Sequence, residues 1–162
     1  MASSLPAFPR FVFTIFEPIS LIAGFLGPLI SPQFFAASQL ATSKDVAEAH
    51  VLTPTENVLA LQLGNTYLLL GLLGLFILNT TLDLPTVNAY LAALWIGDIG
   101  HVLVTGWGLG LKGTLNFLAW NAVTWGNIGV TLALFSVRTL YFLGFFDKQK
   151  SGPKIGRKSK RT

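Results

Sequence analysis

Long apolar runs alternate with polar connections along this chain, and this pattern predicts its elements. Four apolar runs stand out, over residues 11–30, 57–78, 87–109 and 120–143. A membrane-spanning helix needs about 20 mainly apolar residues, and each run reaches that length. The pattern therefore predicts an all-α fold, a four-transmembrane-helix bundle that forms one domain over residues 11–143.

The segments outside the four runs are polar. Residues 1–10 contain prolines and polar side chains, and we expect them to be disordered. The long connection after the first run is predicted to hold a short interfacial helix at residues 32–40. It ends in a capping box, with Thr53 as N-cap and Glu56 three positions later. Residues 144–162 are predicted to form a basic, disordered tail.

The first run has a second interpretation as a cleaved signal peptide. Such a peptide has an apolar stretch of roughly 7–15 residues, but Glu17 interrupts the stretch here. Pro18 and Pro28 also lie in this run. A proline inside a helix removes a backbone hydrogen bond and kinks the helix, which transmembrane helices tolerate. A first transmembrane helix is therefore the favoured interpretation.

Composition agrees with a membrane protein. The chain is 52% hydrophobic and 11% charged, and its mean hydropathy is +0.61, whereas soluble domains are about 25% charged. It contains no Cys, which excludes disulfides, thiolate catalysis and Cys-based metal sites. Two His residues do not suffice for an all-imidazole site, so we expect neither a metal nor another cofactor.

The basic residues are concentrated at the C-terminal end, where seven of the eleven follow Asp147. Cytosolic flanks of transmembrane helices carry an excess of Lys and Arg, so the tail is predicted to be cytosolic. With four spans the N terminus is cytosolic too, and the expected membrane is that of the endoplasmic reticulum. We interpret the tail as a determinant of topology that can touch anionic lipid headgroups. Its position beside a membrane helix argues against binding of nucleic acid.

An ionisable pair interrupts the third run. Asp98 and His101 lie three residues apart near its middle, which places both on one helix face. A charged side chain at the bilayer centre costs about 2.5–3.5 kcal/mol on insertion scales. A carboxylate beside an imidazole orients the ring and raises its basicity. The pair is therefore a candidate acid–base unit.

Other polar residues reach matching depths in the other runs. At about 1.5 Å of rise per residue, Gln62, Asn65 and Asn127 lie level with the imidazole. Glu17 and Arg138 lie at matched depth nearer the cytosolic end, and we expect them to form a buried ion pair. All of these residues also have a purely structural interpretation, because polar and small side chains hold membrane helices together.

Four segments carry a resemblance to a known family. They read FTIFEPIS at residues 13–20, QLGNTYLL at 62–69, IGDIGH at 96–101 and WNAVTWGNIG at 120–129. In this order they resemble a family of small fungal four-helix membrane proteins of unassigned general function. The resemblance implies a fungal source, a four-span bundle and an occurrence beside polyketide and terpenoid biosynthetic genes. The layout is more distantly similar to membrane-bound sterol isomerases and meroterpenoid cyclases, which also use carboxylates inside a helix bundle, as an architectural analogy.

These observations lead to the hypothesis of a cofactor-free enzyme in the lipid bilayer. It would isomerise a lipophilic polyketide or terpenoid intermediate, or open an epoxide and cyclise the product. The predicted catalytic residues are Asp98, His101 and Glu17. The predicted substrate-binding residues are Gln62, Asn65, Trp95, Trp125, Asn127 and Arg138. Indole faces attract a cation, although Trp residues near helix ends also anchor helices at the membrane interface.

Two other classes of protein compete with the enzyme hypothesis. A non-catalytic membrane protein could bind a lipid or scaffold a partner with the same residues. A small transporter is disfavoured, because one four-helix chain encloses little pathway unless it forms a homo-oligomer.

Overall fold

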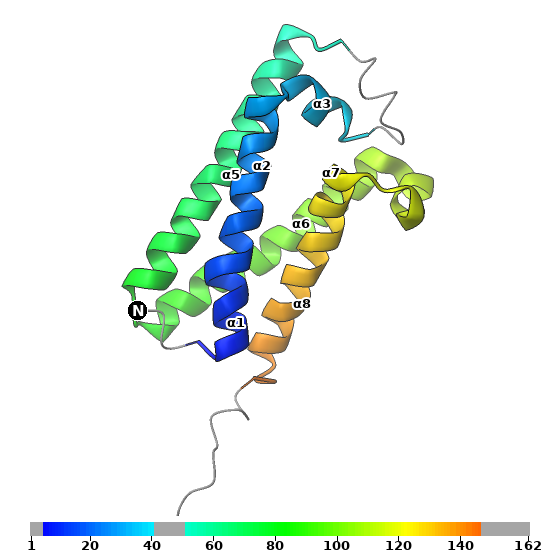
Figure 1. The fold of residues 1–162 in the computed structure, drawn as a ribbon. Coiled ribbons are helices and arrows are strands. Elements are labelled where there is room, and N and C mark those ends of the chain that lie inside the picture. Colours follow the sequence, from blue (N-terminus) through cyan, green and yellow to red (C-terminus); the bar gives the residue numbers. More distant parts are fainter. Residues whose placement is uncertain (1–4, 41–50, 147–162) are drawn as a thin grey trace, which may run out of the picture.

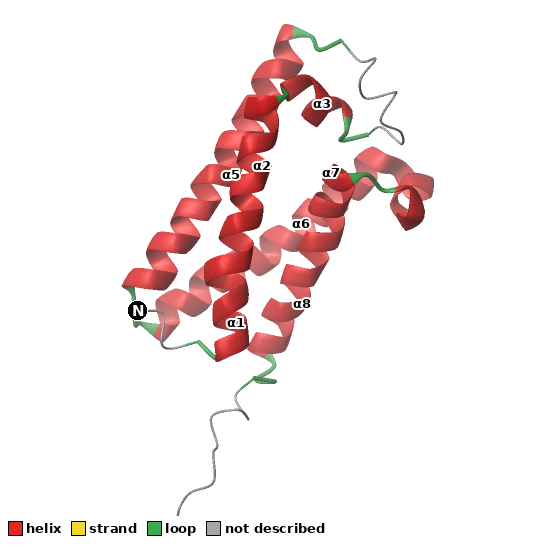
Figure 2. Cartoon of the chain, viewed as in Figure 1, coloured by secondary structure: helices red, strands yellow, loops and turns green. Residues whose placement is uncertain are grey.

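The computed structural model describes residues 5–40 and 51–146, and these residues form helices and no strand (Figure 2). Four helical segments run alternately up and down the molecule, with shorter helices between them (Figure 1). In chain order the elements are α1 (Ala7–Phe11), the π-helix η1 (Val12–Phe16), α2 (Glu17–Ile30), α3 (Pro32–Ala37), α5 (Pro54–Thr80), α6 (Leu84–Leu115), the 3₁₀-helix η2 (Phe117–Ala119), α7 (Ala122–Thr124), the π-helix η3 (Trp125–Val130) and α8 (Thr131–Phe142). The predicted all-α bundle is confirmed.

Three helical segments of the described chain are long and apolar enough to cross a membrane. They are Ala7–Ile30, Pro54–Thr80 and Leu84–Leu115. The fourth segment, α7 to α8, is not clearly apolar, because Asn127 and Arg138 interrupt it. The fold is therefore that of a membrane protein with three helices of spanning length and composition and one more polar helix.

The helix ends differ from the predicted bounds at both ends of the chain. Helix α1 begins at Ala7, inside the segment 1–10 that the composition predicted to be disordered. The reason is burial: Leu5 joins the hydrophobic core and Pro9 is buried beside it. Residues 1–4 lie outside the described part of the chain.

The predicted tail is folded over its first residues. Gly144 ends α8 with a φ of 71°, and the Phe145 N–H donates to the Leu140 carbonyl at 3.0 Å, as in a Schellman motif. Phe146 then packs on Phe8, with 5.6 Å between the ring centroids. The rest of the tail, residues 147–162, lies outside the described residues.

The helix starts follow the capping signals in the sequence. The predicted capping box is confirmed: the Glu56 N–H donates to Thr53 Oγ1 at 3.2 Å, and the Thr53 N–H donates to the Glu56 carboxylate at 2.8 Å. At the start of α6 the Asp83 carboxylate accepts from the Thr86 N–H at 3.1 Å and from its hydroxyl at 2.6 Å. These hydrogen bonds hold the pKa of Asp83 below its usual range. The short helix predicted in the long connection is α3.

Helix α6 is kinked at Gly110, between its long apolar part and its last residues. This residue has a φ of 69°, a left-handed conformation that favours glycine. Two hydrogen bonds fix the residues that follow Gly110. The Thr114 hydroxyl donates to the Gly106 carbonyl at 3.1 Å, and the Trp120 indole donates to the Gly113 carbonyl at 3.0 Å. The kink lies one residue after the predicted end of the third run at 109, although the helix as a whole continues to Leu115.

The long helices form two antiparallel pairs, α2 with α5 and α6 with α8 (Figure 1). The pairs meet where α1 packs against α8, and the hydrophobic core lies at this end. Its buried members include Phe13, Leu78, Leu91 and Leu134. Toward α3 and α7 the pairs diverge, and this divergence positions the site described below.

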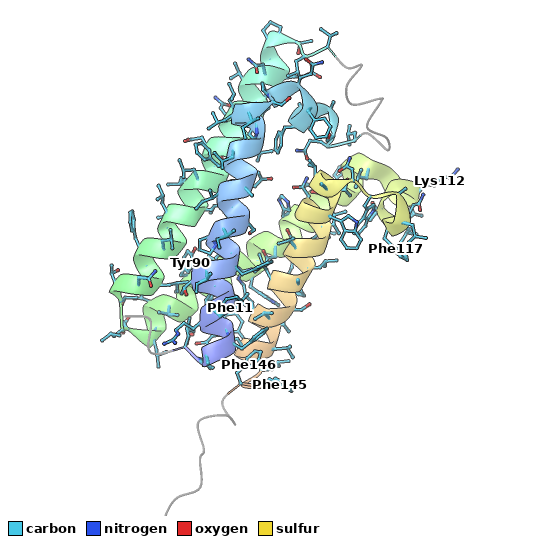
Figure 3. All side chains as sticks on the ribbon, viewed as in Figure 1. Phe11, Tyr90, Lys112, Phe117, Phe145 and Phe146 are labelled. Carbon is cyan, nitrogen blue, oxygen red and sulfur yellow. The ribbon has the colours of Figure 1, made fainter. Side chains whose placement is uncertain are left out.

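The distribution of polarity is inverted relative to a soluble protein. Large apolar side chains such as Phe11, Phe117 and Phe145 project outward (Figure 3), and each is more than half exposed. Arg138, by contrast, is completely buried and Glu17 nearly so. Since charged residues are seldom fully buried in soluble proteins unless paired, this arrangement fits an apolar solvent such as the bilayer core.

Candidate functional site: an interhelical cavity beside a buried charge cluster

A buried cluster of three charged residues joins the two helix pairs. The Arg138 guanidinium, on α8, forms ion pairs with Glu17 at the start of α2 and, at 2.5 Å, with Asp98 on α6. The predicted Glu17–Arg138 ion pair is therefore confirmed. Asp98, the third member of the cluster, was expected to pair with His101 instead.

The local backbone explains how Glu17 reaches the cluster. Pro18 has no N–H and its ring crowds the preceding turn, and the π-helix η1 lies directly before Glu17 and Pro18. π-Turns are common at functional sites because they rotate the following side chains. The Phe13 ring, from the same π-turn, lies 5.3 Å from the Arg138 Cζ. It covers the guanidinium and adds a cation–π contact.

Asp98 and His101 have different partners in the structure. The Asp98 carboxylate turns to Arg138, whereas His101 lines the neighbouring cavity together with Asn127 on η3. The two residues share a helix face, as their spacing predicted, but they belong to two different parts of the site. Asp98 belongs to the charge cluster and His101 to the cavity.

The cavity lies between the diverging helix pairs and has a volume of about 440 Å³. Most of its wall is apolar, and the polar groups come from α2, α5, α6 and the last helical segment. The lining residues are Ser20, Leu21, Ala23, Gly24, Gly27, Phe35, Tyr67, His101, Ala122, Val123, Gly126, Asn127, Val130, Thr131 and Leu134.

Asn127 is the centre of the polar network at this cavity. Its Oδ1 accepts from the Tyr67 hydroxyl at 3.4 Å, and its Nδ2 donates to Gln39 Oε1 at 2.7 Å. Gln39 follows α3, and its neighbour Ser38 accepts a hydrogen bond at 2.8 Å from the Asn121 side chain. The turn after α3 therefore bridges the two helix pairs at their wide end.

Two predicted substrate-binding residues lie elsewhere. Gln62 and Asn65 are exposed, so the prediction that they line the interior is wrong. The side of α5 that faces α2 carries Gly64 and Gly71, which let the helices approach closely, and Tyr67 lies between them at i+3. That small-residue stripe was the available signal for the inward face, and it identifies Tyr67 as the residue of α5 that reaches Asn127.

The two predicted tryptophans contribute to helix packing. Trp95 stacks on Phe135 at 5.5 Å, and its indole donates to the Thr139 hydroxyl at 2.8 Å. Trp125 lies edge-on to Trp120 at 5.0 Å and is 49% exposed. Neither is among the residues that line the cavity. Gln39, which the sequence analysis did not select, has a more direct place at the site.

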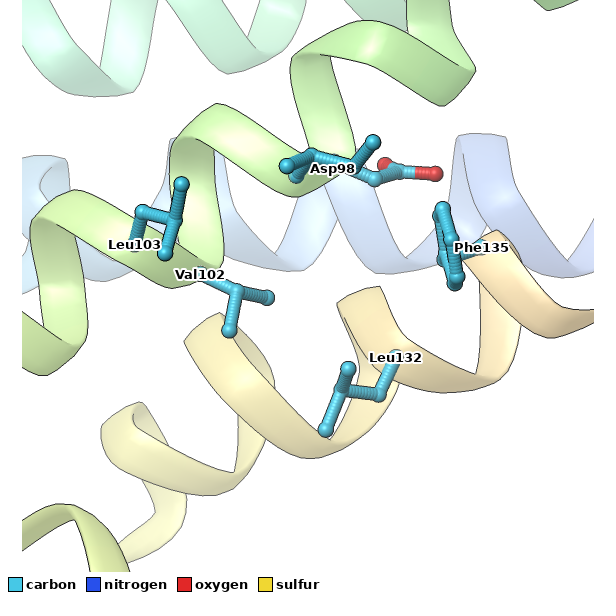
Figure 4. Close-up of a pocket in the computed structure, with 6 residues that line it drawn as sticks. Asp98, Val102, Leu103, Leu132 and Phe135 are labelled. Atoms are coloured by element: carbon cyan, nitrogen blue, oxygen red, sulfur yellow. The ribbon is translucent and has the colours of Figure 1, made fainter.

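A smaller pocket of about 160 Å³ lies between α6 and α8 (Figure 4). The Asp98 carboxylate borders it beside the Phe135 ring, and its other walls are aliphatic side chains of the two helices. Since that carboxylate is already bound to Arg138, the pocket offers mainly apolar contacts.

The site has the groups for proton transfer and hydrogen bonding. His101 can accept or donate a proton, and the Tyr67 hydroxyl and the Asn127 amide can hold an oxygen atom. The described residues contain no group of three or more His, Asp or Glu that could hold a metal ion. An apolar cavity with a few converging polar groups is typical of small-molecule sites.

Fold and site together define an all-helical membrane protein with a partly open cavity between two helix pairs. The chain belongs to the family described as domain of unknown function DUF7704, whose model matches residues 2–148. A search of curated proteins found no match, and neither did a search of solved structures.

Proposed function

We propose that this membrane protein binds a lipophilic small molecule in the interhelical cavity and carries out acid–base chemistry on it. The reaction is an isomerisation, or the opening of an epoxide with cyclisation. One observation carries the proposal: an imidazole, a phenol and an amide share the wall of a mainly apolar cavity of about 440 Å³. Ligand sites of this kind measure about 300–1,000 Å³.

His101 is the proposed proton-transferring residue. Its ring lines the cavity together with the Asn127 side chain, so a bound substrate can meet an imidazole and an amide in the same space. The Tyr67 hydroxyl, next to Asn127, is placed to donate to a carbonyl or epoxide oxygen. Moving a proton from one carbon to another needs no oxidant, so the reaction requires no cofactor.

The carboxylates take a different role from the one expected for them. Glu17 and Asp98 are both bound to Arg138, so we assign proton transfer to His101 and the joining of the helix pairs to the cluster. The resemblance of four segments to a fungal family supports a polyketide or terpenoid intermediate as the substrate. The basic tail supports an endoplasmic-reticulum location with cytosolic termini.

Comparison of His101→Gln with wild type tests the catalytic role. A deletion strain of the source organism is complemented with each form, and metabolites are compared by mass spectrometry at equal protein abundance. General acid–base groups contribute about 10²–10⁴-fold to rate. The strain complemented with the variant should therefore make about 100-fold less product, or less still, than the strain complemented with wild type. Asn65→Ala, on the exposed side of α5, is the matched control and should restore the product fully.

A second candidate is a non-catalytic protein that binds a lipid in the same cavity. It is favoured by the pairing of both carboxylates with Arg138, which leaves His101 and Tyr67 as the titratable groups in the described wall. Full complementation by His101→Gln at wild-type abundance would contradict the enzyme and support this candidate.

A further inference from the structure

We infer that the cavity selects a neutral lipophile with one hydrogen-bonding oxygen and about 15–20 carbon atoms, in preference to charged amphiphiles. This inference rests on the proposed function, because it names the substrate class of the same cavity. Three features of the wall carry it: volume, lack of full charges and the arrangement of the polar groups.

The volume sets the size of the ligand. An apolar protein cavity of about 150 Å³ takes one benzene molecule, and the present cavity of about 440 Å³ is three times as large. It therefore matches a compact molecule of two or three rings, or a folded isoprenoid chain of similar size. A two-chain phospholipid is much larger than this space.

The charge of the wall sets the class of headgroup. None of the described residues that line the cavity is Asp, Glu, Lys or Arg. The charged cluster of Glu17, Asp98 and Arg138 is not part of the wall, and its members are bound to one another. A carboxylate or ammonium group in this cavity would be desolvated without a full counter-charge, which is strongly unfavourable.

The polar groups of the cavity wall favour a ligand that carries an oxygen atom. Tyr67 and Asn127 meet at 3.4 Å, which is long for an O–H···O hydrogen bond. The Tyr67 hydroxyl can therefore turn from Asn127 to a ligand oxygen at little cost. Ser20 and Thr131 add hydroxyl groups to the same wall, so a pure hydrocarbon would leave several polar groups facing apolar carbon.

Gly126 allows the cavity to be filled without a clash. It lines the cavity, and a Cβ added there would meet no atom within 4 Å. Gly126→Leu therefore occupies ligand space with a side chain that the fold can accept. Gly97→Leu is the matched control, because Gly97 is exposed like Gly126 and a Cβ there also meets nothing within 4 Å, but Gly97 is not among the residues that line the cavity.

The experiment uses the full-length protein in lipid nanodiscs and three probes with one carbon skeleton. Radiolabelled farnesol is the bound probe, and farnesene and ionised farnesoic acid are competitors. Farnesol should compete about tenfold or more better than either, a difference measurable from displacement curves. Gly126→Leu should weaken farnesol binding by about tenfold or more, whereas Gly97→Leu should leave it unchanged.

Tyr67→Phe provides a second measurement that does not depend on the cavity-filling variant. It should weaken farnesol binding several-fold and leave farnesene binding as it was, since only the hydroxyl is lost. Equal or tighter binding of farnesoic acid would overturn the inference, as would farnesol binding that Gly126→Leu does not reduce or the absence of farnesol binding. The displacement assay measures binding by the wild-type protein without turnover, so failure of this ligand class is distinguishable from loss of product in the complementation test of the proposed function.

Discussion

At the scale of single residues, the contacts of the completely buried Arg138 join the two helix pairs. Its guanidinium binds one carboxylate from each helix pair, Glu17 and Asp98, and the Phe13 ring covers it. A guanidinium suits this role because it is planar and has several donors for carboxylates. In an apolar medium these ion pairs hold the narrow end of the bundle together.

Removal of the cation should therefore destabilise the protein strongly. Arg138→Met leaves two buried carboxylates facing each other, and breaking such a cluster by removing one partner costs about 3–5 kcal/mol. Equilibrium unfolding of purified protein in mixed detergent measures the loss.

A triple variant serves as the control for this prediction. Glu17→Gln with Asp98→Asn and Arg138→Met removes all three charges, and a neutral replacement of a buried ion cluster is often tolerated. We expect it to recover much of the lost stability. If Arg138→Met alone unfolds like wild type, the cluster does not hold the helix pairs together.

At the scale of elements, the pair of α2 and α5 is defined by close backbone contact. A Cβ at Gly64 would lie 2.6 Å from the Pro28 ring, and one at Gly24 would lie 2.9 Å from the Tyr67 ring. Small residues allow this approach, which is the main source of packing between helices in a membrane. The same contact fixes the rotation of α5, so Tyr67 faces the cavity.

A pair of alanine substitutions tests this contact. Gly64→Ala forces a methyl group into a rigid proline ring and should destabilise the protein by about 1–3 kcal/mol. Gly100→Ala meets no atom within 4 Å and should be neutral or stabilise α6 by up to about 1 kcal/mol. Thermal unfolding in detergent compares the two variants, and equal midpoints would contradict close packing at Gly64.

At the scale of the whole molecule, two helix pairs are joined at one end and open at the other. The joined end contains the hydrophobic core and the contact of α1 with α8. The open end is bridged by the turn after α3 through Gln39 and Asn127. A cavity between two such supports can admit a ligand while the charge cluster keeps the helix pairs together.

The up-and-down order of the four helical segments predicts that both described ends of the chain lie on the same side of the membrane. Glycosylation tags at the N and C termini should both remain unmodified in microsomes, and a tag in the connection between α3 and α5 should be modified. The native sequon Asn79-Thr80-Thr81 lies at the C-terminal end of α5 and should also stay unmodified. Modification of only one terminal tag would mean that the last segment does not span.

Local interactions determine several features that the sequence predicted correctly. Thr53 and Glu56 form the capping box, and the three most apolar segments form helices of spanning length, because caps and hydrophobic runs act within a few residues of one another. The Glu17–Arg138 ion pair could also be predicted, because depth in a membrane follows from counting residues along a helix, and a buried charge needs a partner.

Only the tertiary structure decided which polar residues share the site. Spacing fixes which residues of one helix lie on the same face, but it leaves open the rotation of that helix relative to its neighbours. Gln62 and Asn65 consequently face outward and Tyr67 faces the cavity, because Gly64 and its neighbours pack against α2. Asp98 likewise binds Arg138 and leaves His101 to the cavity, since a guanidinium forty positions further along the chain offers the carboxylate a full opposite charge.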